Sequence, residues 1–286
     1  MKFALCNEML SPWSIDNQFE AISAWGYDGV ELAPFSLDPD FSSGASKLAS
    51  VDNISASIRN RIRSASAKTG VKVSGLHWIL AKTEGYFVTT PDSNVRRNTS
   101  EYLKRLAELC ADLGGTYMVL GSPQQRNIPR GASRADADKY ALDMISAVVP
   151  TLEKLGVTLA LEALAPTETN YWTNSEETLD FISELGEPSC VRLHLDCKAM
   201  DGGEYQAIPE VIERVWKTHR CVSFHANDPN LKGPGFGRLD FQPIMAALEK
   251  AGFDGWVGIE PFDYSPGIVE TGRESLRYLK RFVRQA

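Results

Sequence analysis

The sequence is poor in the features that mark secreted, membrane-spanning or zinc-ribbon proteins. Its 286 residues include five cysteines, and none of them forms a C-x-x-C pair. A disulfide framework or a cysteine-based zinc site is therefore not indicated, and the odd number is typical of a reducing compartment. The chain also lacks an apolar run of membrane-spanning length and a charged-then-apolar segment at its start. We expect a cytoplasmic protein without a membrane partner.

Acidic residues outnumber basic ones, 37 to 30. The formal net charge is −7, whereas nucleic-acid-binding surfaces are usually basic, so we expect no nucleic-acid partner. No linker or change of composition divides the chain. The length would suit two domains, but barrel folds of this size are commonly a single domain, and we expect one catalytic domain over residues 1–286.

Short apolar runs alternate along the chain with longer segments of helical spacing. Runs rich in Val, Ile, Leu and Phe that lead into loop-like sequence are typical of buried parallel strands. The expected strands cover residues 3–6, 29–33, 71–77, 116–120, 157–162, 191–196, 221–225 and 256–260. The expected helices cover residues 15–25, 54–69, a segment around 103–113, 134–155, 176–185, 208–219, 241–251 and 268–283, and residues 36–52 are expected as a long loop. This alternation predicts an α/β protein that forms a single (β/α)8 TIM barrel.

Four residues with metal-binding side chains stand at the ends of four successive expected strands. They are Glu162, Asp196, His225 and Glu260. A single charged residue at a strand end usually meets only solvent, but four at matching positions favour a shared site at the carboxyl-terminal face of the barrel. Three carboxylates and one imidazole suit one divalent cation, Mn²⁺ above all, with Mg²⁺ or Co²⁺ as substitutes.

The same residues indicate a chemistry. A bound divalent cation acts as a Lewis acid that polarises the carbonyl of a hydroxy-ketone and makes the adjacent C–H more acidic. Glu162 and Glu260 come from the fifth and eighth expected strands, so they approach the barrel mouth from different sides. One glutamate can then remove the proton while the other returns a proton to the opposite face. We interpret Glu162 and Glu260 as the catalytic pair of a proton-transfer enzyme.

Further polar residues follow other expected strands. Asn7 follows the first strand, and His77 and Trp78 follow the third, where they either contact a polyol or form an aromatic plug over the core. Lys232 and Arg238 lie in a glycine-containing loop after the seventh strand, a recurrent position of phosphate sites in barrels. The alternative for this loop is a mobile lid with incidental charge, and we expect an unphosphorylated substrate.

Several short motifs accompany these residues along essentially the whole chain. They are Gly29-Val-Glu31, Leu161-Glu162, Leu195-Asp196, His225-Ala-Asn-Asp228, Gly235-Phe-Gly237 before Asp240-Phe241, and Gly255-Trp-Val-Gly-Ile-Glu260. With these motifs the sequence resembles the xylose-isomerase-like barrel superfamily, and within it the sugar phosphate isomerase/epimerase branch that includes D-tagatose 3-epimerase-like enzymes. The resemblance implies that the four residues at the strand ends hold one metal ion and that their two glutamates are the acid/base pair. It also implies that Glu168 binds substrate, and Asp228 is a further candidate substrate contact.

Two positions depart from the pattern of ketose 3-epimerases. Those enzymes typically have a histidine three residues after the metal aspartate, where this chain has Ala199, and an arginine six residues after the metal histidine, where it has Leu231. Lys198 and Lys232 are the neighbours of these positions, and Lys198 is a candidate donor in place of the missing histidine. The departures leave room for a substrate other than a simple ketohexose.

The sequence thus favours a metal-dependent isomerase or epimerase of a sugar or sugar-like polyol that acts through an enediolate. The alternative is a metal-dependent dehydratase or lyase of an inosose or keto-sugar on the same scaffold. An endonuclease of the apurinic-site type would use three zinc ions and more than the four histidines present, and the intact ligand set argues against a non-catalytic sugar-binding relative. The expected partner is a small-molecule carbohydrate, and relatives often form homodimers or homotetramers.

Overall fold

The chain folds into a closed barrel of eight parallel strands, in which each strand pairs with its neighbours in sequence and β1 closes onto β8. The structure is a computed structural model and describes residues 1–283. The strands are β1 (Lys2–Cys6), β2 (Gly29–Leu32), β3 (Lys72–Leu76), β4 (Tyr117–Leu120), β5 (Thr158–Glu162), β6 (Val191–Asp196), β7 (Cys221–Ala226) and β8 (Trp256–Ile259). This topology confirms the (β/α)8 barrel expected from the sequence.

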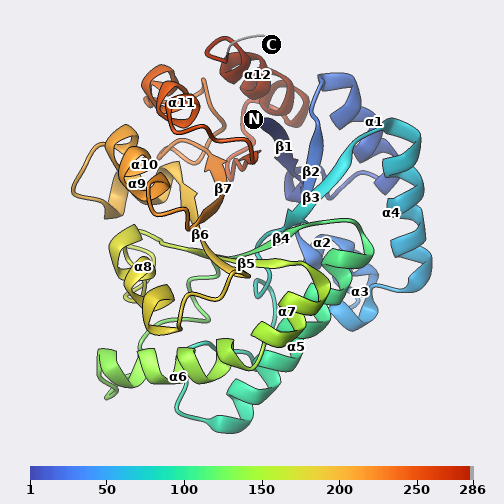
Figure 1. The fold of residues 1–286 in the computed structure, drawn as a ribbon. Helices are drawn as coiled ribbons and strands as arrows, with labels where there is room; N and C mark the ends of the chain where they lie inside the picture. The colour runs from blue at the N-terminus through green and yellow to red at the C-terminus, as the bar shows by residue number, and fades with distance from the viewer. Residues whose placement is uncertain (284–286) are drawn as a thin grey trace.

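Helices surround the strands, as Figure 1 shows. The outer helices are α1 (Ile15–Trp25), α4 (Ala56–Thr69), α5 (Ser93–Asp112), α6 (Arg134–Ser146), α7 (Val149–Leu155), α8 (Ser175–Glu184), α10 (Ile208–Trp216), α11 (Phe241–Lys250) and α12 (Ile268–Lys280). Among the residues that the structure describes, no helix is both long and apolar enough to cross a membrane.

The helix expected over residues 134–155 is two helices. Pro150 stands in the first turn of α7, directly after the break that follows α6. Proline has no backbone N–H and its ring clashes with the preceding turn, so one continuous helix cannot run through this position.

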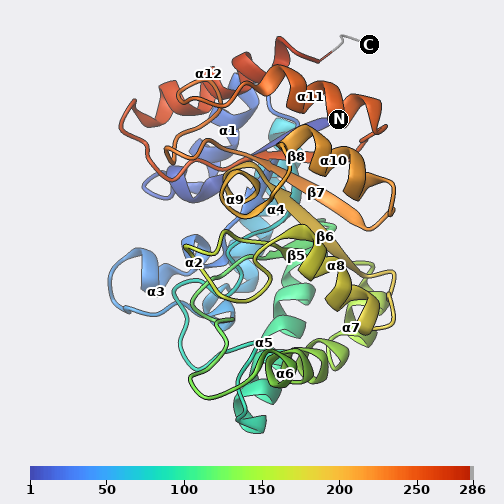
Figure 2. The same cartoon turned by 90° about the vertical axis from the view of Figure 1, so that its left-hand side faces the viewer.

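The loop expected over residues 36–52 contains short helices instead. They are α2 (Pro34–Leu37), α3 (Pro39–Ser42) and a 3-10 turn, η2 (Val51–Asn53), and both α2 and α3 begin with a proline, which is favoured at the first helical position. A further 3-10 turn, η1 (Asn7–Leu10), follows β1, and α9 (Cys197–Gly203) follows β6. Figure 2 shows α2, α3 and α9 on the same side of the barrel, which is the side of the strands' carboxyl ends.

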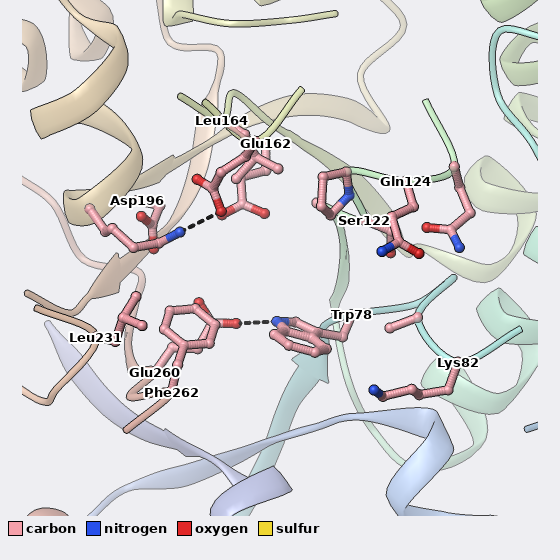
Figure 3. A pocket seen from close by; sticks show the side chains of 16 residues that line it. Trp78, Lys82, Ser122, Gln124, Glu162, Leu164, Asp196, Leu231, Glu260 and Phe262 are labelled. Carbon is pink, nitrogen blue, oxygen red and sulfur yellow. Dashed lines mark hydrogen bonds and ion pairs between the residues drawn. The ribbon is translucent and has the colours of Figure 1, made fainter. Parts of the chain in front are cut away.

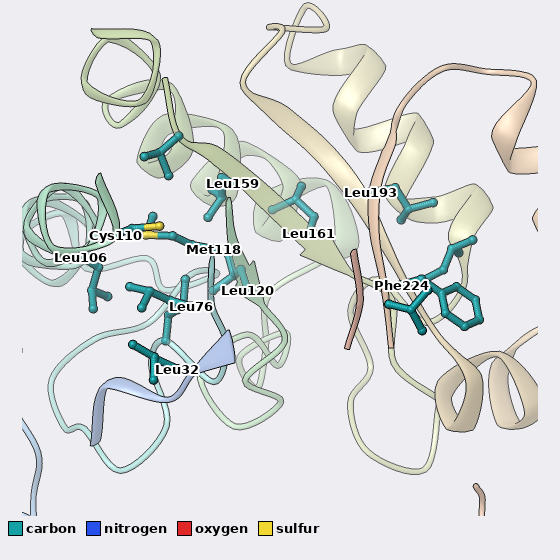
Figure 4. Close-up of a cluster of buried hydrophobic side chains, with 14 of the residues drawn as sticks. Leu32, Leu76, Leu106, Cys110, Met118, Leu120, Leu159, Leu161, Leu193 and Phe224 are labelled. Atoms are coloured by element: carbon teal, nitrogen blue, oxygen red, sulfur yellow. The ribbon is translucent and has the colours of Figure 1, made fainter. Parts of the chain in front are cut away.

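The alternation of side chains along each strand decides what faces the barrel axis. On β5, Leu159 and Leu161 belong to the large apolar core that the strands share with the helices, part of which Figure 4 shows, whereas Ala160 belongs to a separate small cluster with Tyr117 and Val119. Because successive residues of a strand point to opposite faces, Glu162 must point to the same side as Ala160. The apolar core therefore lies outside the barrel wall, and the polar residues at the strand ends project inward.

Candidate active site

Four side chains from neighbouring strand ends converge at the mouth of the barrel. Glu162 ends β5, Asp196 ends β6, His225 lies on β7, and Glu260 directly follows β8. Each of them offers one ligand atom, and these four atoms all lie within 4.8 Å of one another. Their relative exposures are 7%, 2%, 1% and 3% respectively, so the structure collects three carboxylates and an imidazole in one buried cluster.

Neighbouring groups fix the direction of each side chain in this cluster. Asp196 accepts hydrogen bonds from the backbone N–H of Ala199, at 2.7 Å, and from the side-chain amide of Asn227. Nδ1 of His225 lies 3.0 Å from Oε2 of Glu260, whose other oxygen accepts a hydrogen bond of 2.8 Å from the indole N–H of Trp78. The cluster is therefore held in place by groups outside it.

The electrostatics of the cluster favour a bound cation. Burial, together with the charges of Asp196 and Glu260, raises the pKa of Glu162 well above its usual range. Burial and the charge of Glu260 raise the pKa of Asp196 to about 6. A divalent cation would relieve this repulsion between buried carboxylates, and the donor set of oxygens and one nitrogen is one that such a cation accepts. The residues present thus fit one divalent metal ion.

His225 and Glu260 form the one oppositely charged pair of the cluster. Burial lowers the pKa of His225, but the carboxylates of Glu260 and Glu31 outweigh it and raise this pKa well above its usual value. Burial raises the pKa of Glu260, but the His225 ring outweighs it, so this pKa lies below its usual value.

Three members of the cluster, Glu162, Asp196 and Glu260, line a pocket of about 430 Å³, whereas His225 is not part of its lining. Figure 3 shows Glu162 and Asp196 on one side of the pocket and Trp78, Glu260 and Phe262 on the other. The Trp78 and Phe262 rings are stacked, with centroids 5.8 Å apart. The lining is completed by Ala81, Lys82, Gly121, Ser122, Pro123, Gln124, Gln125, Leu164, Glu168, Lys198 and Leu231. The two rings give the pocket a flat apolar surface, and the carboxylates and Lys198 give it charged groups, a combination that suits a polyol.

Three of the predicted substrate-binding residues line this pocket. They are Trp78, Glu168 and Lys198. The ammonium group of Lys198 lies 2.6 Å from Oε1 of Glu168 and 5.1 Å from the centre of the Phe262 ring. Burial lowers the pKa of Lys198, but Asp196 and Glu168 outweigh it, so the net shift is upward and the side chain is charged at the pocket wall.

The other predicted substrate-binding residues are absent from the pocket lining. Asn7 is buried, and its side chain bonds Gln18 Oε1 and the backbone N–H of Ala33. His77 is also buried, with Nε2 at 2.7 Å from Glu8 Oε2. Sequence periodicity cannot distinguish a residue just below the barrel mouth from one at its rim.

The remaining three predicted substrate-binding residues lie in the loop after β7. Asp228 is buried and accepts hydrogen bonds from the backbone N–H groups of Asn230, at 3.1 Å, and Leu239, at 2.8 Å. Lys232 lies 3.9 Å from Asp263, and Arg238 lies 2.5 Å from Asp201. These acidic partners were not apparent from the sequence, because Asp201 lies on α9 and Asp263 in the loop after β8, and only the fold brings them near.

Three residues outside the predicted site contribute to its structure. Gly121, directly after β4, leaves room for Glu162, since a β-carbon there would lie 1.5 Å from Glu162 Oε2. His194 lies on β6, two residues before Asp196 and on the same face, and its buried Nε2 has no hydrogen-bond partner in the described part of the chain. Arg126 is buried, and its guanidinium donates to the backbone carbonyl of Glu162. Residues two apart on a strand face the same side, so the position of His194 two residues before Asp196 could have indicated that it points toward the site.

Comparison with known proteins agrees with this geometry. The family model described as "Xylose isomerase-like TIM barrel" matches residues 19–282. A ketose 3-epimerase from Arthrobacter globiformis is 26% identical over 205 residues, which are 71% of this chain and 68% of that protein. The solved structure of the 3-keto-D-glucoside 4-epimerase YcjR from E. coli superposes with a TM-score of 0.82 at 18% identity, over 98% of this chain and 99% of the other. A structure of the IolI protein with a bound zinc atom superposes with a TM-score of 0.72 at 18% identity, over 99% of this chain and 96% of the other.

The length of chain that the family model matches is sufficient to assign the protein to a family. It covers most of the chain, including all four residues of the buried cluster. The chain therefore belongs to the xylose isomerase-like TIM-barrel family and is an enzyme of its isomerase and epimerase group.

Proposed function

We propose that this enzyme is a divalent-metal-dependent epimerase or isomerase of a sugar or sugar-like polyol. The observation that carries the proposal is that the three carboxylates of the buried cluster, two of them glutamates, line one pocket. The named relatives add that proteins of this kind include ketose and keto-glucoside epimerases.

The metal site of the proposal consists of Glu162, Asp196, His225 and Glu260. Oxygen-rich ligation with a single imidazole suits Mn²⁺ best, with Mg²⁺ or Co²⁺ as substitutes. When bound, the ion supplies the Lewis acidity that polarises a substrate carbonyl and acidifies the neighbouring C–H.

The two glutamates carry the proton. Figure 3 shows Glu162 and Glu260 on facing walls of the pocket. A substrate carbon between them presents one face to each carboxylate, so one glutamate removes the proton to give an enediolate and the other delivers a proton to the opposite face. Their roles exchange when the reaction runs in reverse, and neither is permanently the acid or the base.

The remaining pocket residues bind and orient the substrate. Lys198 and Glu168 present a charged donor and an acceptor beside the cluster, which is where the hydroxyls of a bound sugar need partners. Trp78 and Phe262 provide an apolar surface for the carbon chain, and Leu231 extends it. Lys198 takes the place of the histidine that ketose 3-epimerases typically carry at the position of Ala199.

The substrate is a small-molecule carbohydrate in this proposal, and the enzyme acts in the cytoplasm. Five free cysteines support a reducing compartment.

The test is a substrate screen in D₂O. Metal-stripped enzyme is reloaded with Mn²⁺ and incubated with ketoses, 3-keto-glucosides, inososes and their phosphates. We expect an isobaric product, heavier by one deuterium, with the label on the inverted carbon or on the carbon that receives the proton. A product without solvent deuterium would contradict proton exchange through the glutamates, and an absorbing enone or diketone would establish a lyase instead.

A further inference from the structure

The ring of His225 lies between two carboxylates, and only one of them belongs to the metal cluster. Nδ1 is 3.0 Å from Oε2 of Glu260, and Nε2 is 3.0 Å from Oε1 of Glu31. His225 and Glu31 are 1% and 0% exposed, so water does not compete for either contact. Glu31 does not line the pocket, so its carboxylate contacts His225 and not a substrate bound in the pocket.

Glu31 is held as an acceptor from its other side. The hydroxyl of Tyr117 on β4 donates to Oε2 of Glu31. The carboxylate therefore has one oxygen bound to a donor and the other directed at Nε2 of His225, where an ionised carboxylate can only accept. This arrangement gives an Nε2–H of His225 a fixed acceptor, which retains that proton when a cation takes the place of the proton on Nδ1.

The barrel wall leaves space for this contact. Gly258 on β8 pairs with His225 on β7, and a β-carbon at Gly258 would lie 2.8 Å from Cδ2 of His225 and 3.1 Å from Oε2 of Glu31. Any larger residue would push against both members of the pair. Three strands, β2, β7 and β8, thus combine to place one carboxylate behind one histidine.

We propose that Glu31 is a positioning residue that holds the proton on Nε2 of His225, so that Nδ1 is the nitrogen left to bind the metal. The inference rests on the metal site of the proposed function and adds a residue that does not itself touch metal or substrate. A carboxylate behind a metal-binding histidine fixes its ring orientation and raises its basicity as a ligand.

A competing location for a metal lies at the Nε2 side of the His225 ring, beside Glu31. Cys6, Glu31 and His225 also have ligand atoms within 4.8 Å of one another. However, Cys6 and Glu31 are fully buried and absent from the pocket lining, and the hydroxyl of Tyr117 already occupies one oxygen of Glu31. In the four-residue cluster, by contrast, Glu162, Asp196 and Glu260 all line the pocket, and Nδ1 is the nitrogen of His225 that faces Glu260, so Nδ1 is the nitrogen that would meet the metal.

The first test needs no substitution. Enzyme labelled with ¹⁵N at its four histidines is titrated with diamagnetic Zn²⁺, and the ring nitrogens are followed by long-range ¹H–¹⁵N NMR. We expect one histidine to keep a slowly exchanging Nε2–H while its Nδ1 resonance shifts with zinc. Zinc on Nε2 of that histidine would overturn the inference, and a protein that binds neither Zn²⁺ nor Mn²⁺ would instead refute the proposed metal site.

The second test uses a matched pair of variants. Glu31→Gln removes the charge behind His225, whereas Glu8→Gln makes the same change behind His77, which is not a member of the four-residue cluster. We expect Glu31→Gln to weaken Mn²⁺ binding by about 10–100-fold and to change the Nε2–H signal, as for other outer partners of metal ligands. Glu8→Gln should bind Mn²⁺ like the wild type.

Circular dichroism of the metal-free proteins separates a folding defect from a positioning effect. A folded Glu31→Gln protein with wild-type affinity and an unchanged Nε2–H signal would refute the role of Glu31. If Glu31→Gln does not fold, the tautomer of the wild-type protein decides the question alone.

Discussion

Gly121 and Glu162 occupy adjoining space so closely that no other residue type fits at position 121 without moving the glutamate. A β-carbon on Gly121 would lie 1.5 Å from Oε2 and 2.8 Å from Cδ of Glu162. The backbone contacts around Gly121 are not the obstacle, because the three nearest atoms all belong to this one side chain. The position of Glu162, a proposed metal ligand on β5, thus depends on the absence of a side chain at Gly121 after β4.

Gly121→Ala should therefore displace the Glu162 carboxylate while the barrel stays folded. Disturbing the surroundings of a metal ligand typically weakens metal binding by about 10–100-fold. We expect Gly121→Ala to weaken Mn²⁺ binding by at least this factor. Titration calorimetry measures the affinity, and thermal unfolding of the metal-free protein serves as the control. Wild-type affinity in the alanine variant would show that Glu162 is free to bind metal from another position.

The catalytic assignment predicts the effect of Glu162→Gln and Glu260→Gln. Each amide keeps the shape of the side chain and a weak oxygen ligand but cannot accept the substrate proton. General acid–base catalysis contributes about 10²–10⁴-fold, so kcat should fall by at least that factor, and weakened metal binding should add to the loss. Turnover is measured at saturating Mn²⁺ to separate the two effects. Unimpaired kcat in either variant would remove that glutamate from the proton transfer.

Metal binding should depend on pH in the direction set by the carboxylates of the cluster. In the metal-free protein the pKa of Asp196 is raised to about 6, by burial first and then by Glu260, and that of Glu162 is raised well above its usual value. A raised pKa means that protons occupy these carboxylates up to a higher pH, and a metal must displace them. Mn²⁺ affinity should rise with pH through about 6 and above, with release of protons.

Calorimetry in buffers of different ionisation enthalpy counts the protons released by Mn²⁺. Asp196→Asn removes one of the titrating groups and should reduce that number. An affinity that is constant between pH 5 and pH 8 would contradict the raised pKa values of these carboxylates.

The ends of the strands were predictable from sequence because the signal is local. Glu162 and Asp196 each terminate an apolar run, and a parallel barrel brings the carboxyl ends of its strands to one face whatever the loops do. The ligand set therefore required only strand positions and their order, and the four acceptors come together as that order implies.

The pocket walls were less predictable because loops place them. Leu231 and Phe262 come from the loops after β7 and β8, and the backbone N–H of Phe262 donates to the carbonyl of Leu231 at 2.7 Å. Both side chains are apolar, so nothing in their chemistry marks them in the sequence as pocket residues. Conversely, Lys232 and Arg238 have charges that suggested an anion site, yet both pair with acidic residues away from the pocket. Charge alone does not reveal a partner distant in sequence.

We predict that Lys198 acts on the substrate, whereas Lys232 and Arg238 do not. Lys198→Met removes the charge beside the cluster, and hydrogen bonds to charged groups contribute about 1.5–3 kcal/mol, so kcat/KM should fall by roughly 10–100-fold. Lys232→Ala and Arg238→Ala serve as controls and should leave kcat/KM unchanged, for free and phosphorylated sugars alike. A strong preference for a sugar phosphate that disappears in either control variant would restore the anion site in this loop.

Trp78 combines a hydrogen bond to a proposed catalytic residue with an unusual backbone conformation. Its φ of 51° lies in the left-handed region, which bulky residues seldom adopt, and its indole N–H donates to Oε1 of Glu260 at 2.8 Å. Backbone conformations of this kind persist where the surroundings hold them, often at functional sites. The ring also stacks on Phe262, so Trp78 contributes both a donor and a wall of the pocket.

Trp78→Phe separates these two contributions, because phenylalanine keeps an aromatic ring beside Phe262 but has no N–H. Glu260 then loses the donor that fixes one of its oxygens, and an interaction of about 1.5–3 kcal/mol with a charged group corresponds to roughly a 10–100-fold loss in kcat. KM should change less, since the apolar wall remains. The matched variant Phe262→Leu removes the stacking partner but leaves the N–H, and it should raise KM more than it lowers kcat. If Trp78→Phe changed only KM, Trp78 would be a substrate-binding surface alone, and its bond to Glu260 would have no part in the proton transfer.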